Sequence, residues 1–473
     1  MTKSDIDSLI ELKIIDIGAE GKAIGKIDED FVIFVDNGVP GDVVKARIKK
    51  VKINYAEAKC EEILTNSIHR IEPRCEYFGV CNGCRTQNID YNYQLELKRN
   101  TVKNAFSRIG GFKDIDIPPV IGSESIFYYR NKLEFSFSAN RWLTSDDMDK
   151  EIADKKFALG YHIPNFIDKV LDVHNCYLQS ETSVKIVNLT RDFFKQRNES
   201  IYSTKTHSGY LRFLVIRQSP ITKEILVNLI TSEDRQEFIK EFGEYLKVNI
   251  PEITTFINSI SAKKSQIAVG DYSNTIFGNG YITEYLDKYN FKITPQTFFQ
   301  TNTLQSKILF DKLIEISSFN KNNNVLDLYC GCGAISLYIS QFVNKVTAVE
   351  LIQESINSAK ENAENNKVTN CEFIVYDVKD YLNNLVLNDD KHFDTIILDP
   401  PRSGIHPKAA EYLLELGPPK IIYVSCNPTT QARDIKLLSE KYIIKSIQPV
   451  DMFPQTLHIE NIVVLIPTEV GIS

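Results

Sequence analysis

The feature that most constrains the fold is a series of short apolar runs in the carboxyl-terminal third of the chain, with helical segments between them. The runs at residues 325–328, 346–349, 373–376, 393–398 and 421–424 are rich in Val, Ile and Leu. Strands that are buried on both faces and joined by helices form a parallel, doubly wound sheet. We therefore expect an α/β domain with such a sheet in this part of the chain.

The first of these runs leads into a glycine turn. Gly331 and Gly333 lie between a predicted strand and a predicted helix. Glycine lacks the Cβ atom that would keep a ligand from approaching the backbone, as in nucleotide-binding turns. Serine occupies position 336, where a dinucleotide fingerprint would place its third spaced glycine. The turn therefore favours S-adenosylmethionine over NAD as the ligand of a Rossmann-like domain.

Acidic residues accompany successive strands. Asp327 lies in the first run, and Glu350, Asp377 and Asp399 directly follow the second, third and fourth runs. Open α/β sheets bind ligands at the carboxyl ends of their strands, where a residue such as Glu350 can accept hydrogen bonds from both hydroxyls of a ribose. The alternative is that these carboxylates are ordinary caps at strand ends.

A cysteine follows the fifth run, on a turn bounded by proline. A buried cysteine is usually inert packing. Cys426, however, is predicted to lie at a strand end beside the methyl donor, next to Asp399 and the prolines that follow it. A nucleophilic cysteine needs such access and a lowered pKa. We therefore expect Cys426 to be a nucleophile.

A nucleophilic cysteine beside a methyl donor would suit an acceptor such as carbon 5 of uracil, which does not react without a nucleophile. Addition of a thiolate to carbon 6 converts the ring into an enolate that can take a methyl group, and a base must then remove the proton from carbon 5. Residues 457–462 have the pattern of a strand whose period of two puts His458 and Glu460 on one face. Glu460 is our candidate base. The alternative is that both residues are structural polar partners in a sheet.

The amino-terminal segment predicts a small β-barrel. Short β-like runs between residues 9 and 64 are broken by glycines and by a turn at 37–42. Apolar and basic residues alternate over 44–49, so a strand there would bury one set and display the other. The basic face of this barrel either binds nucleic acid or is an ordinary strand face in contact with solvent.

The chain has 473 residues, nine cysteines and a net charge of −7. Its length predicts two or three domains, and its odd number of cysteines fits metal ligation or catalysis better than a disulfide framework. It has no apolar run of membrane-spanning length, and residues 1–7 are too polar for a secretory signal. We therefore expect a cytoplasmic protein that does not bind membranes.

Taken together, these residues resemble the family of RNA 5-methyluridine methyltransferases, in particular the bacterial 23S ribosomal RNA members that carry an iron–sulfur cluster. The resemblance covers nearly the whole chain. It rests on the basic barrel, which is similar to the TRAM domain of that family, and on the cysteine-rich segment 75–84. The segments 424–428 and 451–460 match those that carry the family's nucleophile and base.

The resemblance implies a [4Fe-4S] cluster that clips the central domain together. Its ligands would be Cys75, Cys81, Cys84 and the distant Cys176. Both iron–sulfur clusters and zinc accept four thiolates, so the spacing by itself would also suit zinc.

The resemblance also implies contacts to the substrates. S-adenosylmethionine would meet Gln300, Tyr329, Glu350 and Asp399, with Asp377 near the adenine. Residues 129–132 resemble a family segment close to the RNA, where aromatic and guanidinium planes suit stacking on unpaired bases. The target uridine would be flipped out of the RNA.

We therefore predict a multi-domain α/β protein with three units. An OB-like β-barrel of the TRAM type spans residues 1–70, and an α+β central domain comprises 71–92 and 127–292. A Rossmann-like class I methyltransferase domain comprises 93–126 and 293–473. The predicted function is methylation of carbon 5 of a uridine in 23S ribosomal RNA, by a monomer.

Three alternatives compete with this prediction. The first is the T-loop uridine of tRNA, although family members that act there generally lack the barrel and the cluster cysteines. The second is an iron–sulfur RNA-binding protein without turnover, which the presence of both Cys426 and Glu460 disfavours. The third is an amino-group methyltransferase, whose chemistry needs no cysteine nucleophile.

Overall fold

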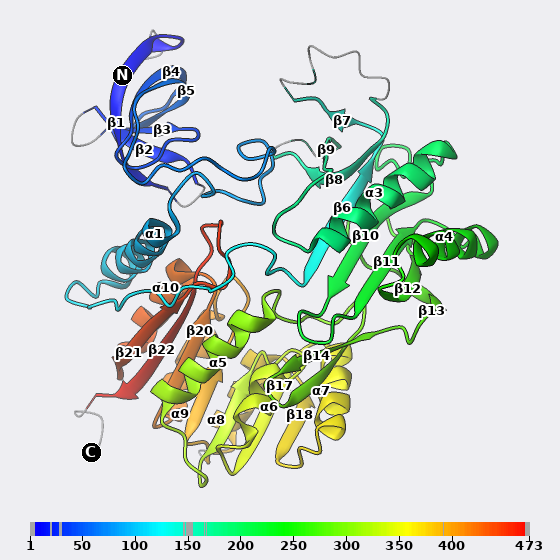
Figure 1. The fold of residues 1–473 in the computed structure, drawn as a ribbon. Coiled ribbons are helices and arrows are strands. Elements are labelled where there is room, and N and C mark those ends of the chain that lie inside the picture. The colour runs from blue at the N-terminus through cyan, green and yellow to red at the C-terminus, as the bar shows by residue number, and fades with distance from the viewer. Residues whose placement is uncertain are drawn as a thin grey trace.

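The computed structural model contains three bodies. A small barrel lies at the amino-terminal end, a sheet with two helices follows it, and a large sheet flanked by helices forms the carboxyl-terminal part (Figure 1). The structure describes residues 5–18, 21–27, 31–144, 147, 155–164, 166, 168–390 and 392–468. Residues 1–4 of the polar opening segment lie outside this set. No helix within the described ranges is long and apolar enough to cross a membrane.

The amino-terminal strands close into a barrel in the order β1-β2-β3-β5-β4. They are β1 (Leu9–Ile17), β2 (Ala23–Lys26), β3 (Val32–Val35), β4 (Val43–Val51) and β5 (Tyr55–Thr65). The alternation predicted over 44–49 is present, because Val44, Ala46 and Ile48 are fully buried in the barrel core.

The basic face of the barrel is largely neutralised by neighbouring carboxylates. Lys22 lies 3.0 Å and Lys50 3.1 Å from the carboxylate of Glu57. Two further cations on β4 have acidic partners, in the pairs Arg47–Glu61 and Lys49–Asp7, each at 3.1 Å. The strand therefore displays ion pairs rather than a row of free cations.

The central body is an eight-stranded sheet in the order β13-β12-β11-β10-β6-β8-β9-β7. Its strands are β6 (Lys132–Ser138), β7 (Arg141–Trp142), β8 (Ala158–His162), β9 (Val170–Asp172), β10 (Leu211–Gln218), β11 (Ile225–Thr231), β12 (Ile253–Ile260) and β13 (Tyr272–Phe277). Helices α3 (Glu181–Gln196) and α4 (Gln236–Asn249) pack on this sheet through a core that includes Phe193, Phe194 and Phe242. The hairpin β14 (Ile282–Leu286) and β15 (Tyr289–Ile293) leads into the last body.

The carboxyl-terminal sheet has the order β18-β17-β16-β19-β20-β22-β21. Its strands are β16 (Asn324–Leu328), β17 (Lys345–Glu350), β18 (Cys371–Val375), β19 (Thr395–Leu398), β20 (Ile421–Ser425), β21 (Tyr442–Val450) and β22 (Glu460–Pro467). Its helices are α5 (Thr303–Ser317), α6 (Ala334–Ser340), α7 (Gln353–Asn365), α8 (Val378–Leu387), α9 (Pro407–Leu416) and α10 (Pro428–Leu438).

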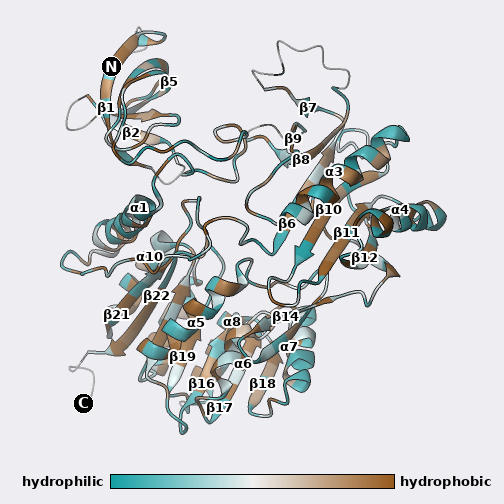
Figure 2. Ribbon diagram, in the orientation of Figure 1, coloured by the Kyte–Doolittle hydropathy of each residue, from teal (hydrophilic) through white to brown (hydrophobic). Residues whose placement is uncertain are grey.

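Strands β16 to β20 are parallel, so the prediction of a doubly wound sheet is confirmed. Strands β16, β19 and β20 are buried almost along their whole length, as expected for strands covered on both faces, and hydrophobic colour dominates the sheet in Figure 2. The chain crosses from one side of β16 to the other, which makes the carboxyl end of β16 a topological switch point where such folds bind ligands. Strand β21 was not predicted, and β22 pairs antiparallel between β20 and β21.

An early helical segment packs on this last body. Helix α1 (Tyr91–Asn104) continues into the π-helix η2 (Ala105–Gly110), whose Phe106 shares a core with Tyr423 of β20. The Asp90 side chain caps α1 by accepting a hydrogen bond from the backbone of Asn92. This packing supports assigning residues 93–126 to the methyltransferase unit, and the domain bounds given above stay a prediction.

Candidate active site

A cavity of about 1080 Å³ lies at the carboxyl ends of the parallel strands. It is large enough for a nucleotide-sized ligand and part of a second one. The predicted residues that line it are Gln300, Tyr329, Gly331, Glu350, Asp377, Asp399, Cys426 and Glu460. One site thus brings together the residues proposed for cofactor binding and those proposed for chemistry.

The two glycines of the turn have different roles. A Cβ atom built on Gly331 would meet no described atom within 4 Å, so this position leaves open space beside the cavity. A Cβ on Gly333 would lie 3.0 Å from Phe373 and 3.1 Å from Ala359, and Gly333 is not among the described residues that line the cavity. Both have positive φ, 56° and 81°. Gly331 therefore suits ligand approach, whereas Gly333 lets α6 begin close to its neighbours.

Glu350 and Asp377 hold defined positions at the edge of the cavity. The Glu350 carboxylate accepts hydrogen bonds from the backbone N–H groups of Gly331 (3.2 Å) and Ile352 (3.0 Å). Asp377 caps α8 by accepting from the N–H of Asp380 at 3.1 Å. Both carboxylates serve local structure, as the alternative interpretation held, and both still line the cavity.

Asp327 does not behave as predicted. It lies inside β16, is fully buried and accepts a hydrogen bond from the hydroxyl of Ser336 on α6. Within the described structure its Oδ1 atom has no hydrogen-bond partner, and burial raises the pKa of its carboxyl to about 7. Asp327 precedes the last residue of β16, and its side chain links β16 to α6 instead of lining the cavity.

The sheet register places the proposed nucleophile opposite the proposed base. Strands β20 and β22 pair antiparallel with Ser425 opposite Asn461. Extending that register by one residue sets Cys426 against Glu460, which begins β22 and is 5% exposed. Residues 457–459 are not part of the strand, so the predicted strand start is wrong, but His458 also lines the cavity.

The electrostatics of this pair differ from the prediction. Burial, with the nearby Glu460 carboxylate, raises the pKa of the Cys426 thiol to about 11, whereas a lowered pKa was expected. Burial also raises the pKa of Glu460 well above its usual value, and that of Asp399 to about 7. In the free protein, the partly buried Cys426 thiol and the buried Glu460 carboxyl are therefore both neutral at neutral pH.

Arg402 is a site residue to which the sequence analysis gave no role. Its guanidinium opposes the rise in the pKa of both Cys426 and Glu460, and it lies 3.4 Å from the Nε2 atom of His458. Burial is the main cause that lowers the pKa of His458 to about 4, with the Arg402 charge second. The signal available in the sequence was a cation directly after the strand-end Asp-Pro-Pro segment.

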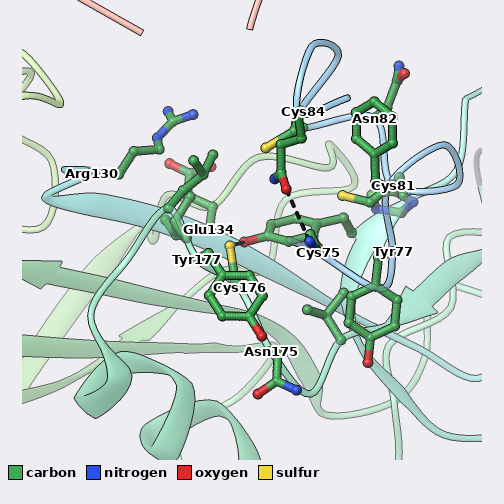
Figure 3. Close-up of a pocket in the computed structure, with 18 of the residues that line it drawn as sticks. Cys75, Tyr77, Cys81, Asn82, Cys84, Arg130, Glu134, Asn175, Cys176 and Tyr177 are labelled. Carbon is green, nitrogen blue, oxygen red and sulfur yellow. Dashed lines mark hydrogen bonds between the residues drawn. The ribbon is translucent and has the colours of Figure 1, made fainter. Parts of the chain in front are cut away.

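The four predicted cluster cysteines line a second cavity, of about 480 Å³. In Figure 3 the sulfur atoms of Cys81, Cys84 and Cys176 are turned toward this space. Burial raises the pKa of Cys81 to about 11 and of Cys84 to about 12. As the described side chains are placed, no three His, Cys, Asp or Glu residues are close enough together to hold one metal ion.

The two cavities share a wall. Asn82, Gly83, Arg130 and Thr301 line both of them. Tyr129, which was expected to lie free for stacking on RNA, is instead 5% exposed and donates a hydrogen bond to the backbone oxygen of Pro454 at 3.0 Å. The loop that carries the cysteines therefore also lines the cavity that contains Cys426 and Glu460, which we call the reaction cavity.

Known proteins resemble this chain over its whole length. Two curated relatives bear the name "Uncharacterized RNA methyltransferase". The one from Chlorobaculum tepidum is 39% identical over 96% of this chain and 95% of its own. The one from Bacteroides thetaiotaomicron is 40% identical over 95% of this chain and 99% of its own.

One solved structure is similar along nearly the entire fold. It is the tRNA (uracil-54, C5)-methyltransferase of Pyrococcus abyssi in complex with S-adenosyl-L-homocysteine, with 28% identity and a TM-score of 0.74. The match covers 97% of this chain and 100% of that one.

Two family models match the sequence. Residues 7–60 match the TRAM domain, and residues 218–468 match tRNA (Uracil-5-)-methyltransferase. The second match contains the cavity-lining residues from Gln300 to Glu460. The chain therefore belongs to the family of S-adenosylmethionine-dependent RNA (uracil-5-)-methyltransferases and carries a TRAM domain at its amino-terminal end.

Proposed function

We propose that this chain methylates carbon 5 of a uridine in 23S ribosomal RNA, with Cys426 as covalent nucleophile and Glu460 as base. The observation that carries the proposal is the register of β20 and β22, which sets the two side chains against each other in the reaction cavity. An amino-group methyltransferase would have no use for a thiol at this place.

The reaction would proceed in three steps. Cys426, as thiolate, adds to carbon 6 of the uridine and forms a C–S bond, and the electron pair of the 5,6 double bond moves toward oxygen 4 as an enolate. Carbon 5 then takes the methyl carbon from the sulfonium, leaving S-adenosylhomocysteine. Glu460 removes the proton from carbon 5, the double bond reforms, and the C–S bond breaks to return the thiolate.

The chain's own residues would prepare these steps. Arg402 lowers the pKa of both reacting acids, so it favours the thiolate and the carboxylate that the reaction needs. Around S-adenosylmethionine, Gly331 leaves room at the backbone and Glu350 takes the ribose hydroxyls. Gln300, Tyr329, Asp377 and Asp399 complete the proposed contacts.

A covalent trap tests the mechanism. RNA that contains 5-fluorouridine has no proton to lose at carbon 5, so the C–S bond should persist after methyl transfer. We expect a protein–RNA adduct that survives denaturing electrophoresis with the wild-type chain and none with Cys426→Ala. Cys371→Ala serves as a control, because it changes a cysteine on β18 that does not line this cavity. Methylated 5-fluorouridine RNA without any adduct would contradict the covalent mechanism.

We also propose that Cys75, Cys81, Cys84 and Cys176 bind a [4Fe-4S] cluster. Four soft thiols that line one cavity suit such a group, which would tie the loop at 75–84 to the central sheet. Anaerobically purified protein should contain iron and sulfide in equal amounts and absorb visible light, and Cys84→Ser should lose both. Zinc without iron would contradict the cluster.

The choice of RNA is open to direct measurement. The similarity to the Pyrococcus abyssi enzyme, which is named for uracil-54 of tRNA, favours the T-loop of tRNA as the second candidate. Because that similarity spans this whole chain, overall architecture does not separate the two RNAs. Loss of 5-methyluridine from 23S ribosomal RNA in cells lacking this protein would support our proposal, and loss from tRNA alone would overturn it. We further propose that the protein acts as a cytoplasmic monomer.

A further inference from the structure

A cluster of three aromatic rings and one guanidinium lies beside the cysteine cavity. The Cζ atom of Arg74 is 4.4 Å from the ring centre of Tyr177, 5.1 Å from that of Tyr128 and 5.3 Å from that of Phe127. Arg74 is exposed, and Tyr128 is 37% exposed. We call these four residues the Arg74 cluster.

The backbone holds the exposed ring of this cluster in place. Tyr128 has a φ of 56°, in the left-handed region that a bulky residue seldom adopts. Its N–H donates to the backbone oxygen of Tyr177 at 2.7 Å, and its hydroxyl accepts from Arg74 at 2.8 Å. The next residue, Tyr129, is buried. The strained backbone therefore sends one tyrosine inward and keeps its neighbour at the surface, and such strain is concentrated at ligand-binding sites.

Arg130 connects the cluster to the reaction cavity. It lies two residues after Tyr128 and lines both cavities. Its Nε atom is buried and has no hydrogen-bond partner among the described residues. Neither Arg74 nor Arg130 forms an ion pair with a carboxylate in the described part of the chain. A guanidinium that lines a cavity without a carboxylate partner suits an anionic acceptor, and an RNA phosphate provides one.

From this arrangement we infer that the Arg74 cluster binds an unpaired nucleobase of the RNA substrate, close to the target uridine. The base stacks on the exposed face of Tyr128 and Arg74, and an intervening phosphate accepts from Arg130. This inference rests on RNA being the substrate. Every base has a flat π-face, so such a site tolerates base identity and acts on affinity and on the path of the strand.

Fluorescence of 2-aminopurine tests the inference directly. The probe is a 23S ribosomal RNA transcript fragment that the wild-type chain methylates, with each unpaired nucleotide near the target replaced in turn by 2-aminopurine. We expect one position to be quenched on binding to wild type. Tyr128→Leu should abolish that quenching and weaken RNA binding by roughly fivefold to 100-fold, as expected for the loss of one stacked base.

Matched variants separate stacking from folding. Tyr272→Leu removes another exposed tyrosine, on β13 (53% exposed, against 37% for Tyr128), and should leave quenching and RNA affinity unchanged. Tyr128→Phe keeps the ring and should retain both. Binding of S-adenosylhomocysteine should be the same in all variants.

Two results overturn the inference while leaving the methyltransferase proposal intact. In the first, wild-type enzyme methylates the RNA but quenches 2-aminopurine fluorescence at no position near the target. In the second, the Tyr128→Leu variant binds RNA and quenches 2-aminopurine fluorescence as well as Tyr272→Leu does. If the wild-type chain methylates neither 23S ribosomal RNA nor tRNA, the proposed function fails first, and the inference fails with it.

Discussion

At the scale of single residues, burial raises the pKa of both Cys426 and Glu460, and a neighbouring carboxylate adds to each rise: Glu460 for the Cys426 thiol and Asp399 for Glu460. The pair is therefore neutral in the free protein at neutral pH. Among the described residues, Arg402 favours proton loss from both groups, and the sulfonium of a bound donor would add a second positive charge. Reactivity of the thiol is thus expected to depend on the assembled site.

Replacing the base should trap the reaction part-way. Glu460→Gln keeps the shape of the side chain but cannot take the carbon-5 proton. We expect turnover to fall by roughly 100-fold to 10,000-fold, the usual contribution of a general base. A covalent RNA adduct should accumulate with ordinary uridine and be visible on denaturing gels. Absence of an adduct, with turnover still lost, would assign Glu460 a step before methyl transfer.

The raised pKa of Asp399 predicts a pH-dependent cost in stability. In the folded protein this pKa is about 7, against 3.8 for an ordinary aspartate, so the native state binds an extra proton between these values. Stability therefore falls as pH rises through this window. We expect Asp399→Asn, without ligands, to melt at a higher temperature than wild type at pH 8 and at an equal temperature below pH 3.8. Equal melting at both pH values would contradict the burial of this carboxylate.

At the scale of elements, one buried ion pair joins α1 to the segment that precedes the base. The Nζ atom of Lys98 lies 2.6 Å from the Asp451 carboxylate, and the two side chains are 3% and 0% exposed. Tyr91 donates to the same carboxylate at 2.9 Å, and Lys98 also donates to the backbone oxygen of Phe453 at 3.1 Å. Residues far apart in sequence thereby position the chain between β21 and β22.

Breaking this pair should be costly. Lys98→Met leaves the Asp451 carboxylate buried without its partner, which typically costs about 3–5 kcal/mol in the free energy of unfolding. Urea denaturation would measure the loss, and RNA methylation should fall because the segment carrying His458 loosens. The matched change Lys240→Met, at an exposed pair on α4, should cost roughly 0–1 kcal/mol.

A double variant tests whether the cost comes from the stranded charge. Lys98→Met combined with Asp451→Leu removes both partners, and replacement of a whole buried pair by apolar groups is often neutral. We expect the double variant to regain much of the lost stability. A double variant as unstable as the sum of the two single ones would show instead that packing dominates.

At the scale of the whole molecule, the affinity for RNA is expected to depend on how many cations are free of acidic partners. The chain has a net charge of −7, and Glu57 on the barrel pairs with both Lys22 and Lys50. Binding of phosphates to these lysines therefore competes with an ion pair inside the protein.

Glu57→Gln should release these two lysines for RNA. We expect tighter RNA binding, and a plot of log affinity against log salt that is steeper by roughly 1 to 2, as for two added phosphate contacts. Glu237→Gln on α4 frees Lys240 by the same chemical change and serves as the control. Equal effects of the two variants would contradict a role of the barrel in RNA binding.

The sequence alone was sufficient for features that depend on local pattern. Alternation over 44–49 predicted the barrel strand, and the apolar runs predicted the parallel strands, because burial on one face or on two dictates these periodicities. The strand-end positions of Glu350, Asp399 and Cys426 followed from the same runs, since carboxyl ends of parallel strands meet at one edge.

Only the tertiary structure decided how side chains from distant segments meet. The position of Cys426 opposite Glu460 depends on β22 entering between β20 and β21, and Arg402 acts on both groups from the loop that follows β19. The sequence could not show that Tyr129 points inward while Tyr128 stays exposed. Burial and pairing are non-local: they are set by which elements pack together, and short-range patterns carry no information about that packing.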